Sequence, residues 1–206
     1  MRTRIKICGI TRIEDALAAA QAGADAIGLV FEPKSPRCVD PKQAAAIARA
    51  LPPYVTVVGL FVDAAPQYVH DVLSRVNLDL LQFHGNEAPE SCRAYPKPYV
   101  KAIHMTPDVD LHAAERRYPD AAGLLLDSFS PVAAGGSGQV FDWNSVPHDL
   151  KKPVILAGGL TPENVTEAIQ RVRPYAVDVS SGVEQGKGIK DVKKISAFIE
   201  AVRLAV

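Results

Sequence analysis

The sequence predicts an α/β protein, a single (β/α)8 barrel (TIM barrel) that spans residues 1–206. Eight short runs of apolar and β-branched residues recur along the chain, and helical patterns separate several of them. Division of the 206 residues by eight leaves about 26 residues for each strand, crossover helix and pair of turns, close to the minimum. Runs that are apolar throughout are typical of parallel strands covered on both faces. Eight such strands favour a closed barrel over an open doubly wound sheet of five or six strands.

The expected strands are rich in β-branched and apolar residues and are bounded by turn-forming residues. They cover residues 5–8, 26–31, 55–62, 78–83, 99–103, 123–126, 154–157 and 176–179. Apolar residues with helical spacing follow the first, second, third and seventh of these strands. The stretches 104–122 and 139–153 show poor helical periodicity, so we expect short or irregular crossovers there.

Three of the expected helices carry start signals. Thr11 followed by Glu14 is typical of a capping box at the first helix. Asp40-Pro41 and Thr161-Pro162 each place a capping side chain before a proline, which is favoured at the first helical position. These signals predict helices that begin at those points.

Composition narrows the classes of function. Lysine plus arginine total 23 and aspartate plus glutamate total 23, so the formal net charge is zero, and no binding of nucleic acid or of an anionic membrane is expected. The three cysteines, at positions 8, 38 and 92, are too widely spaced for a disulfide framework or a zinc motif. The early apolar run 26–31 is far shorter than the roughly 20 residues of a membrane span. The sequence therefore predicts a cytoplasmic protein.

Polar residues lie at the carboxyl ends of four expected strands, which is where (β/α)8 barrels carry functional side chains. Because side chains alternate between the two faces of a strand, Lys6 and Cys8 share one face, and Ile5 and Ile7 pack against the helices. The same alternation applies to the other strands. The polar residues expected to face one mouth are Lys6, Cys8, Gln82, His84, Asp127, Asp178 and Ser180.

Cys8 and Asp127 are the candidate catalytic residues. An isolated cysteine is most often a small buried apolar residue, but the ammonium of Lys6 on the same face would favour a thiolate that acts as base or nucleophile. Asp127 is either a helix cap or loop residue, or a carboxyl that desolvation keeps protonated as a general acid. The glycines of Gly135-Gly-Ser-Gly138 suit a mobile lid above it.

Two glycine-bearing turns follow the last two expected strands and predict a phosphate site. Backbone N–H groups and hydroxyls stabilise an anion, and the loops after the seventh and eighth strands often hold phosphate in this fold. The alternative is a pair of ordinary tight turns. The candidate phosphate-binding residues are Gly158, Gly159, Ser180, Ser181 and Gly182.

Arg37 follows the second expected strand and is either solvated or bound to a carboxylate in bidentate fashion. The histidines show no metal-ligand spacing, so no metal site is predicted. The first βα turn has one glycine and is no dinucleotide fingerprint.

Taken together, these segments resemble the phosphoribosylanthranilate isomerases, the enzymes of the Amadori rearrangement in tryptophan biosynthesis. The resemblance covers almost the whole chain. The segments that carry it are residues 6–11, 31–37, 81–85, 126–127, 135–138, 141–143, 157–159 and 177–183.

The resemblance implies conversion of N-(5-phosphoribosyl)anthranilate to 1-(2-carboxyphenylamino)-1-deoxyribulose 5-phosphate without a cofactor. It implies Cys8 as general base and Asp127 as general acid. Arg37 would face the anthranilate carboxylate, and the loops after the seventh and eighth strands would hold the phosphate. Asp178 would contact a ribose hydroxyl or the anthranilate amine, and Lys6, Gln82 and His84 complete the expected substrate-binding set.

Two other readings stay open at this point. Another phosphate-binding barrel enzyme, such as a sugar-phosphate epimerase or an indole-glycerol-phosphate synthase, would share the fold and phosphate loops, and the Lys-x-Cys pair of the first strand discriminates against it. A non-catalytic barrel would bind a phosphorylated ligand without turnover. Either a monomer or a homodimer fits the sequence.

Overall fold

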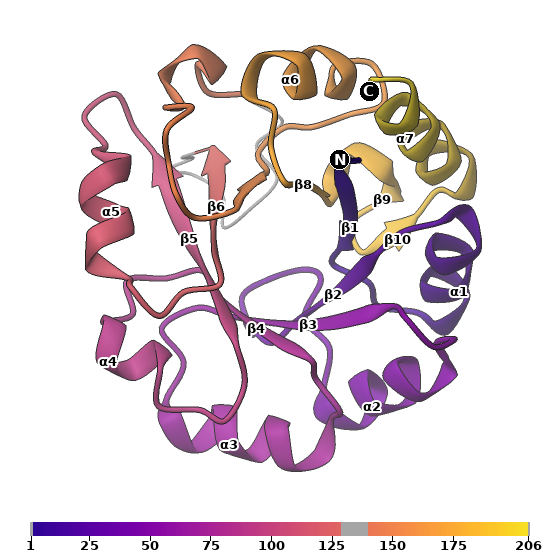
Figure 1. Cartoon of the computed structure of the whole chain (residues 1–206). Helices are drawn as coiled ribbons and strands as arrows, with labels where there is room; N and C mark the ends of the chain where they lie inside the picture. Colours follow the sequence, from indigo (N-terminus) through magenta and orange to yellow (C-terminus); the bar gives the residue numbers. More distant parts are fainter. Residues whose placement is uncertain (1, 129–139, 206) are drawn as a thin grey trace.

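A computed structural model describes residues 2–128 and 140–205 of the chain. Eight parallel strands form a closed barrel in sequential order, and helices surround it (Figure 1). The expected glycine lid at 135–138 lies outside the described residues. The barrel strands are β1 (Arg4–Cys8), β2 (Ala26–Val30), β3 (Thr56–Phe61), β4 (Leu80–Phe83), β5 (Tyr99–Met105), β6 (Gly123–Ser128), β7 (Val154–Leu156) and β8 (Ala176–Val179).

In the described residues an α-helix follows each barrel strand except β6, which a 3-10 turn follows, and this alternation is typical of the barrel. The helices are α1 (Ile13–Ala22), α2 (Pro41–Ala50), α3 (Pro66–Arg75), α4 (Pro89–Cys92), α5 (Leu111–Arg117), α6 (Val165–Val172) and α7 (Val192–Leu204), with single 3-10 turns η1 (Trp143–Ser145) and η2 (Ser181–Val183). A two-stranded hairpin, β9 (Glu184–Gly186) and β10 (Ile189–Lys190), precedes α7. The crossover in 104–122 holds the short helix α5 of 7 residues, and the described residues 140–153 hold only the 3-10 turn η1, which agrees with the expectation of short or irregular crossovers.

Pairing of β1 with β8 closes the barrel and places Lys6 beside Asp178. Residues that alternate with the inward positions, such as Ile7 and Leu126, belong to the main apolar core between the strands and the helices. Smaller clusters fill the barrel interior, including Ala102 with Leu125 and Ala157. The alternation that the sequence predicts for β1 and β6 is therefore confirmed.

The helix start signals give a mixed outcome. Asp40 caps α2 as expected, and its side chain accepts from the N–H groups of Lys42 and Gln43. The capping box at the first helix is wrong, because α1 follows Arg12 without a side-chain cap and the Thr11 hydroxyl instead donates to the carbonyl of Gly188.

The start predicted at Thr161-Pro162 is confirmed only in part: the Thr161 hydroxyl accepts from the N–H of Glu163 at 3.3 Å, as a capping side chain does, but the helix starts further along the chain. Helix α6 begins three residues later, at Val165. The Asn164 side chain explains the delay, since it accepts from the N–H of Thr161 at 2.8 Å and donates to the carbonyl of Gly159 at 2.9 Å. These contacts keep residues 161–164 in a turn that belongs to the loop after β7.

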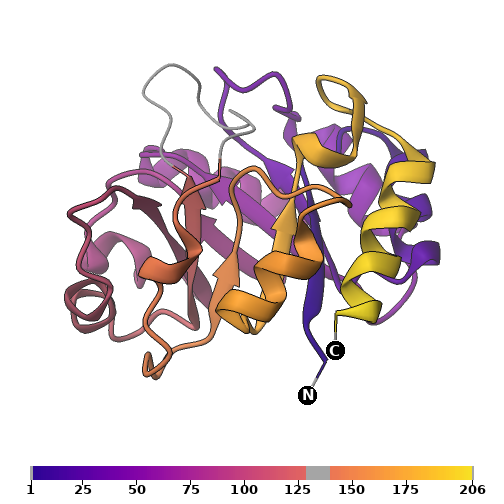
Figure 2. The same ribbon diagram turned by 90° about the horizontal axis from the view of Figure 1, so that it is seen from above.

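The two ends of the barrel differ. In Figure 2 both chain termini lie at one end, and the hairpin β9–β10 lies at the opposite end, where the strands finish. No helix of the described chain is long and apolar enough to cross a membrane.

Candidate active site

The inward side chains of β1 and β8 form a buried group at the mouth of the barrel. The Lys6 Nζ donates to Asp178 Oδ2 at 2.7 Å, and the two side chains are 9% and 6% exposed. Gly28 of the neighbouring β2 makes the space for this group, because a Cβ there would lie 2.7 Å from Cys8 Sγ and 3.1 Å from Lys6 Cε. The sequence prediction that Lys6 and Cys8 share the inward face is confirmed.

The thiol of Cys8 is less acidic than the sequence suggested. Burial raises its pKa, and the Lys6 ammonium only partly opposes that effect because the nearby Asp178 carboxylate raises the pKa further. An ammonium already paired with a carboxylate stabilises a second anion weakly. The expectation that the Lys6 ammonium favours the thiolate therefore holds in direction, but burial outweighs it and the net shift of the Cys8 pKa is upward.

A second polar group lies on β4 and β6. Gln82 Nε2 and His84 Nδ1 are 2.9 Å apart, and His84 Nε2 is 3.0 Å from Asp127 Oδ2. Since the amide N–H donates to Nδ1, the proton of a neutral His84 ring is on Nε2 and is donated to the carboxyl group. His84 and Asp127 have side chains 17% and 19% exposed, whereas Gln82 is fully buried beneath them.

The loops after β7 and β8 pack against each other. Gly158 and Gly159 have φ angles of 80° and 66°, which favour glycine. A Cβ on Gly182 would collide with the carbonyl oxygen of Leu160, so only glycine permits this approach of the two loops. Within the described chain, the N–H groups of Gly158 and Gly159 make no hydrogen bond, and free amides of this kind bind anions.

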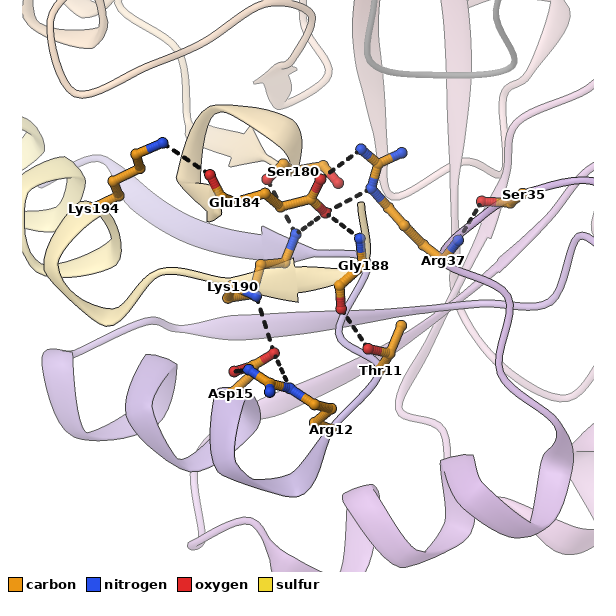
Figure 3. Close-up of polar contacts among 10 residues, drawn as sticks. All are labelled: Thr11, Arg12, Asp15, Ser35, Arg37, Ser180, Glu184, Gly188, Lys190 and Lys194. Atoms are coloured by element: carbon orange, nitrogen blue, oxygen red, sulfur yellow. Dashed lines mark hydrogen bonds and ion pairs between the residues drawn. The ribbon is translucent and has the colours of Figure 1, made fainter. Parts of the chain in front are cut away.

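The side chain of Arg37 is buried and forms an ion pair with Glu184. Its Nε and Nη2 donate to the two carboxylate oxygens of Glu184 at 2.7 and 2.8 Å, and its side chain is 9% exposed. Lys190 Nζ donates to the same carboxylate at 2.9 Å and to the carbonyl of Ser180 at 3.0 Å (Figure 3). The expected solvated alternative is wrong, because a partner in the hairpin β9–β10 buries the guanidinium.

Glu184 and Lys190 belong to the site, although the sequence pattern does not predict a role for either. Glu184 lies 147 residues beyond Arg37, and no local pattern joins a loop residue to a hairpin at that separation. One weak signal is its position, since Glu184 lies two residues after Gly182 of the predicted phosphate-binding turn. The last helix, α7, was also not predicted, although Ile195, Ile199 and Val202 have helical spacing.

Three polar atoms at the mouth are buried and have no hydrogen-bond partner among the described residues. They are Gln82 Oε1, Asp178 Oδ1 and Ser180 Oγ. A buried polar atom without a partner costs stability, so atoms of this kind at the mouth of a barrel indicate a place where a polar ligand completes the bonding. Across the described chain no group of three or more histidine, cysteine, aspartate or glutamate residues is arranged to hold a metal ion.

The closed eight-stranded barrel, with a cysteine, a lysine and carboxyl groups at its mouth, defines a (β/α)8-barrel enzyme. The family model "N-(5'-phosphoribosyl)anthranilate (PRA) isomerase" matches residues 5–201. The chain belongs to this family.

Individual proteins agree with the family match. An N-(5'-phosphoribosyl)anthranilate isomerase from Pseudomonas putida is 60% identical over 202 residues, which cover 98% of both chains. The crystal structure of the phosphoribosyl anthranilate isomerase of Thermotoga maritima superposes with a TM-score of 0.90 at 45% identity, over 98% of both chains. A further isomerase structure, 43% identical with a TM-score of 0.86 over 98% of both chains, is a complex with reduced 1-(o-carboxyphenylamino)-1-deoxyribulose 5-phosphate.

Proposed function

We propose that the chain converts N-(5-phosphoribosyl)anthranilate to 1-(2-carboxyphenylamino)-1-deoxyribulose 5-phosphate, with Asp127 as general acid and Cys8 as general base. Family membership supports the reaction. The observation that carries the residue assignment is the placement of the two side chains. Both face inward at the carboxyl ends of their strands, and β1 and β6 are three positions apart in the ring of eight.

Asp127 starts the reaction in this proposal. Its carboxyl proton goes to the furanose ring oxygen, the bond between that oxygen and C1′ breaks, and the lone pair of the anthranilate nitrogen forms a C1′=N iminium. The His84 hydrogen bond fixes which way the carboxyl group points. The nearly buried site keeps water from the iminium.

Cys8 completes the reaction. The iminium acidifies the proton on C2′, the Cys8 thiolate removes it, and the electron pair forms the C1′=C2′ enolamine. The Cys8 thiol then gives its proton to C1′ and the C2′ hydroxyl proton goes to the Asp127 carboxylate, which forms the ketone and restores both side chains. The iminium of the substrate itself accepts the electron pair from C2′. The protein therefore has only to transfer protons, which its side chains can do.

The two anionic ends of the substrate have separate binding places in this proposal. The phosphate binds at Gly158, Gly159, Ser180, Ser181 and Gly182, where the two loops meet. The anthranilate carboxylate binds Arg37. Lys6 and Asp178 face the sugar between them, and the unpartnered Asp178 Oδ1 supports a bond to a ribose hydroxyl or to the anthranilate amine.

The cytoplasm is the proposed compartment. Cys8, Cys38 and Cys92 are all free thiols, which is the usual state of cysteines in a reducing environment.

The decisive experiment follows the loss of anthranilate fluorescence while the substrate is generated in situ. Cys8→Ala and Asp127→Asn are each expected to lower kcat by about 10² to 10⁴, the usual contribution of a positioned base or acid, with small changes in KM. Matched controls are Cys92→Ala, a buried free cysteine of α4 in the core between strands and helices, and Asp149→Asn, whose side chain is 78% exposed. Turnover near the wild-type level in Cys8→Ala or Asp127→Asn would reject that residue's role.

A further inference from the structure

Arg37, Glu184 and Lys190 form a buried charge cluster beside the mouth. Their side chains are 9%, 6% and 0% exposed. Glu184 binds both cations, so the cluster holds two positive charges against one negative charge. A buried excess of positive charge is costly unless an anion balances it. The cluster therefore calls for a negatively charged group from outside its own three side chains.

The contact with Glu184 uses only one edge of the Arg37 guanidinium. Nε and Nη2 bind the carboxylate, and in Figure 3 the other terminal nitrogen, Nη1, points away from Glu184. A guanidinium carries five N–H donors in a planar fork. The edge formed by Nη1 and the second N–H of Nη2 is therefore still able to bind another carboxylate with two parallel hydrogen bonds.

The orientation of that edge is fixed by the surrounding contacts. The Arg37 side chain passes over Gly9, directly after β1, where a Cβ would collide with the Arg37 Cδ. Glu184 is fixed in turn, because its Oε1 also accepts from Lys190 Nζ at 2.9 Å and from the N–H of Gly188 at 3.3 Å. Both Arg37 and Lys190 are close enough to Cys8 to interact with it electrostatically.

We propose that Glu184 and Lys190 are positioning residues that orient Arg37, so that its remaining edge binds the carboxylate on the aromatic end of the substrate. Glu184 sets the plane of the guanidinium, and Lys190 fixes Glu184 because its Nζ donates both to that carboxylate and to the carbonyl of Ser180. This inference rests on the proposed function. The fixed edge of the guanidinium would explain why the site prefers a substrate that carries a carboxylate to one that does not.

The test measures binding by calorimetry, so that it does not depend on turnover. The first probe is reduced 1-(o-carboxyphenylamino)-1-deoxyribulose 5-phosphate, called the reduced product here. The second probe is the same compound without the carboxylate on its aromatic ring. Glu184→Gln places an amide N–H₂ where Arg37 or Lys190 needs an acceptor. We expect it to weaken binding of the first probe at least about tenfold and to leave binding of the second within about twofold.

A double-mutant cycle separates positioning from a merely structural role. In an Arg37→Ala background, Glu184→Gln is expected to cause no further loss of affinity for the carboxylate probe, because its effect passes through Arg37. Lys190→Met, which keeps the aliphatic length, is expected to reproduce the selective loss. Glu200→Gln and Lys193→Met, both on exposed positions of α7, are the matched controls and should bind both probes normally.

The outcomes are distinct. Wild-type protein that fails to bind the reduced product contradicts the proposed function itself. If the wild type binds normally but Glu184→Gln weakens the binding of both probes equally, only the positioning role is overturned. Additive losses of affinity in the double-mutant cycle would overturn the same role. If Glu184→Gln and Lys190→Met both unfold, Arg37→Lys decides the matter. It keeps an ion pair with Glu184 but has no second edge, so retained preference for the carboxylate probe would overturn the inference.

Discussion

At the scale of single residues, the environment of Cys8 determines when it can accept a proton. Burial raises its pKa, Lys6 and Lys190 lower it, and Asp178 adds to the rise. A protonated thiol cannot act as a base, so the active fraction grows as the pH rises toward this raised pKa. In the wild type the profile belongs to the two catalytic groups together, so a variant without the second group isolates Cys8.

The Asp127→Asn variant isolates Cys8. We expect its residual kcat/KM to rise with pH, about tenfold per unit while the thiol is mostly protonated, and to level off only above the ordinary range of a thiol pKa. Addition of Lys6→Met should move that limb to still higher pH, because the ammonium that favours the thiolate is gone. Stopped assays across the pH range check both results. A residual rate that does not change with pH would remove Cys8 from the role of base.

Gln82 offers a second prediction at this scale. Its amide orients the His84 ring, which in turn contacts Asp127. Gln82→Leu removes that bond and also removes the unpartnered Oε1, so the free energy of unfolding should change little. We expect kcat to fall roughly tenfold, the equivalent of one hydrogen bond, with a small change in KM. Steady-state kinetics and thermal unfolding check this, and an unchanged kcat would show that Asp127 is oriented without the His84 ring.

At the scale of elements, the sequence predicted the parts that depend on local pattern. The eight strands follow from apolar runs, and the inward position of Lys6 and Cys8 follows from alternation along β1. Helix starts were less predictable. Thr11 has the side chain of a cap but bonds to Gly188 of the hairpin β9–β10, and a contact so distant in sequence outweighs the local preference.

The close packing of the loops after β7 and β8 gives a prediction for Gly182. A methyl group there would meet the backbone of Leu160 and Thr161, which cannot move aside as a side chain can, so Gly182→Ala must push the two loops apart. We expect KM to rise by about tenfold or more, since a small displacement of binding groups is costly. Competition by inorganic phosphate should weaken in parallel.

Gly186→Ala is the matched control for this loop. A Cβ at Gly186 would meet no atom within 4 Å, so the same change at this position at the end of β9 should leave KM and phosphate competition unaltered. Equal KM values for Gly182→Ala and the wild type would place the phosphate elsewhere.

At the scale of the whole molecule, the site joins residues that are far apart in sequence. Lys6 and Asp178 are separated by 172 positions and meet because β1 pairs with β8. Alternation predicted that each would face inward, but their ion pair depends on register across the closure of the barrel. Arg37 contacts Glu184 because the hairpin β9–β10 brings Glu184 beside the loop after β2, and no local pattern in the sequence predicts that hairpin. The strand pattern therefore predicted which side chains face the mouth of the barrel, whereas tertiary packing determines which of the charged side chains form ion pairs there.

This distribution predicts that a ligand stabilises the barrel as a unit. The candidate residues come from β1, β4, β6 and β8 and from the segments after β2, β4, β7 and β8, and an unfolded chain brings none of them together. A ligand at one hundred times its Kd adds about 2.7 kcal/mol to the free energy of unfolding. For a chain of this length that corresponds to a rise in Tm of about 5 to 10 °C.

Thermal unfolding with the reduced product checks this expectation. Cys8→Ala should keep the full rise in Tm, because Cys8 acts on a proton and contributes little to binding. Gly182→Ala and Arg37→Ala should each show a smaller rise at the same ligand concentration, because each weakens one anionic end. A rise that is equal in all four proteins would mean that the ligand binds away from the mouth, since neither the phosphate loops nor the guanidinium would then contribute to its affinity.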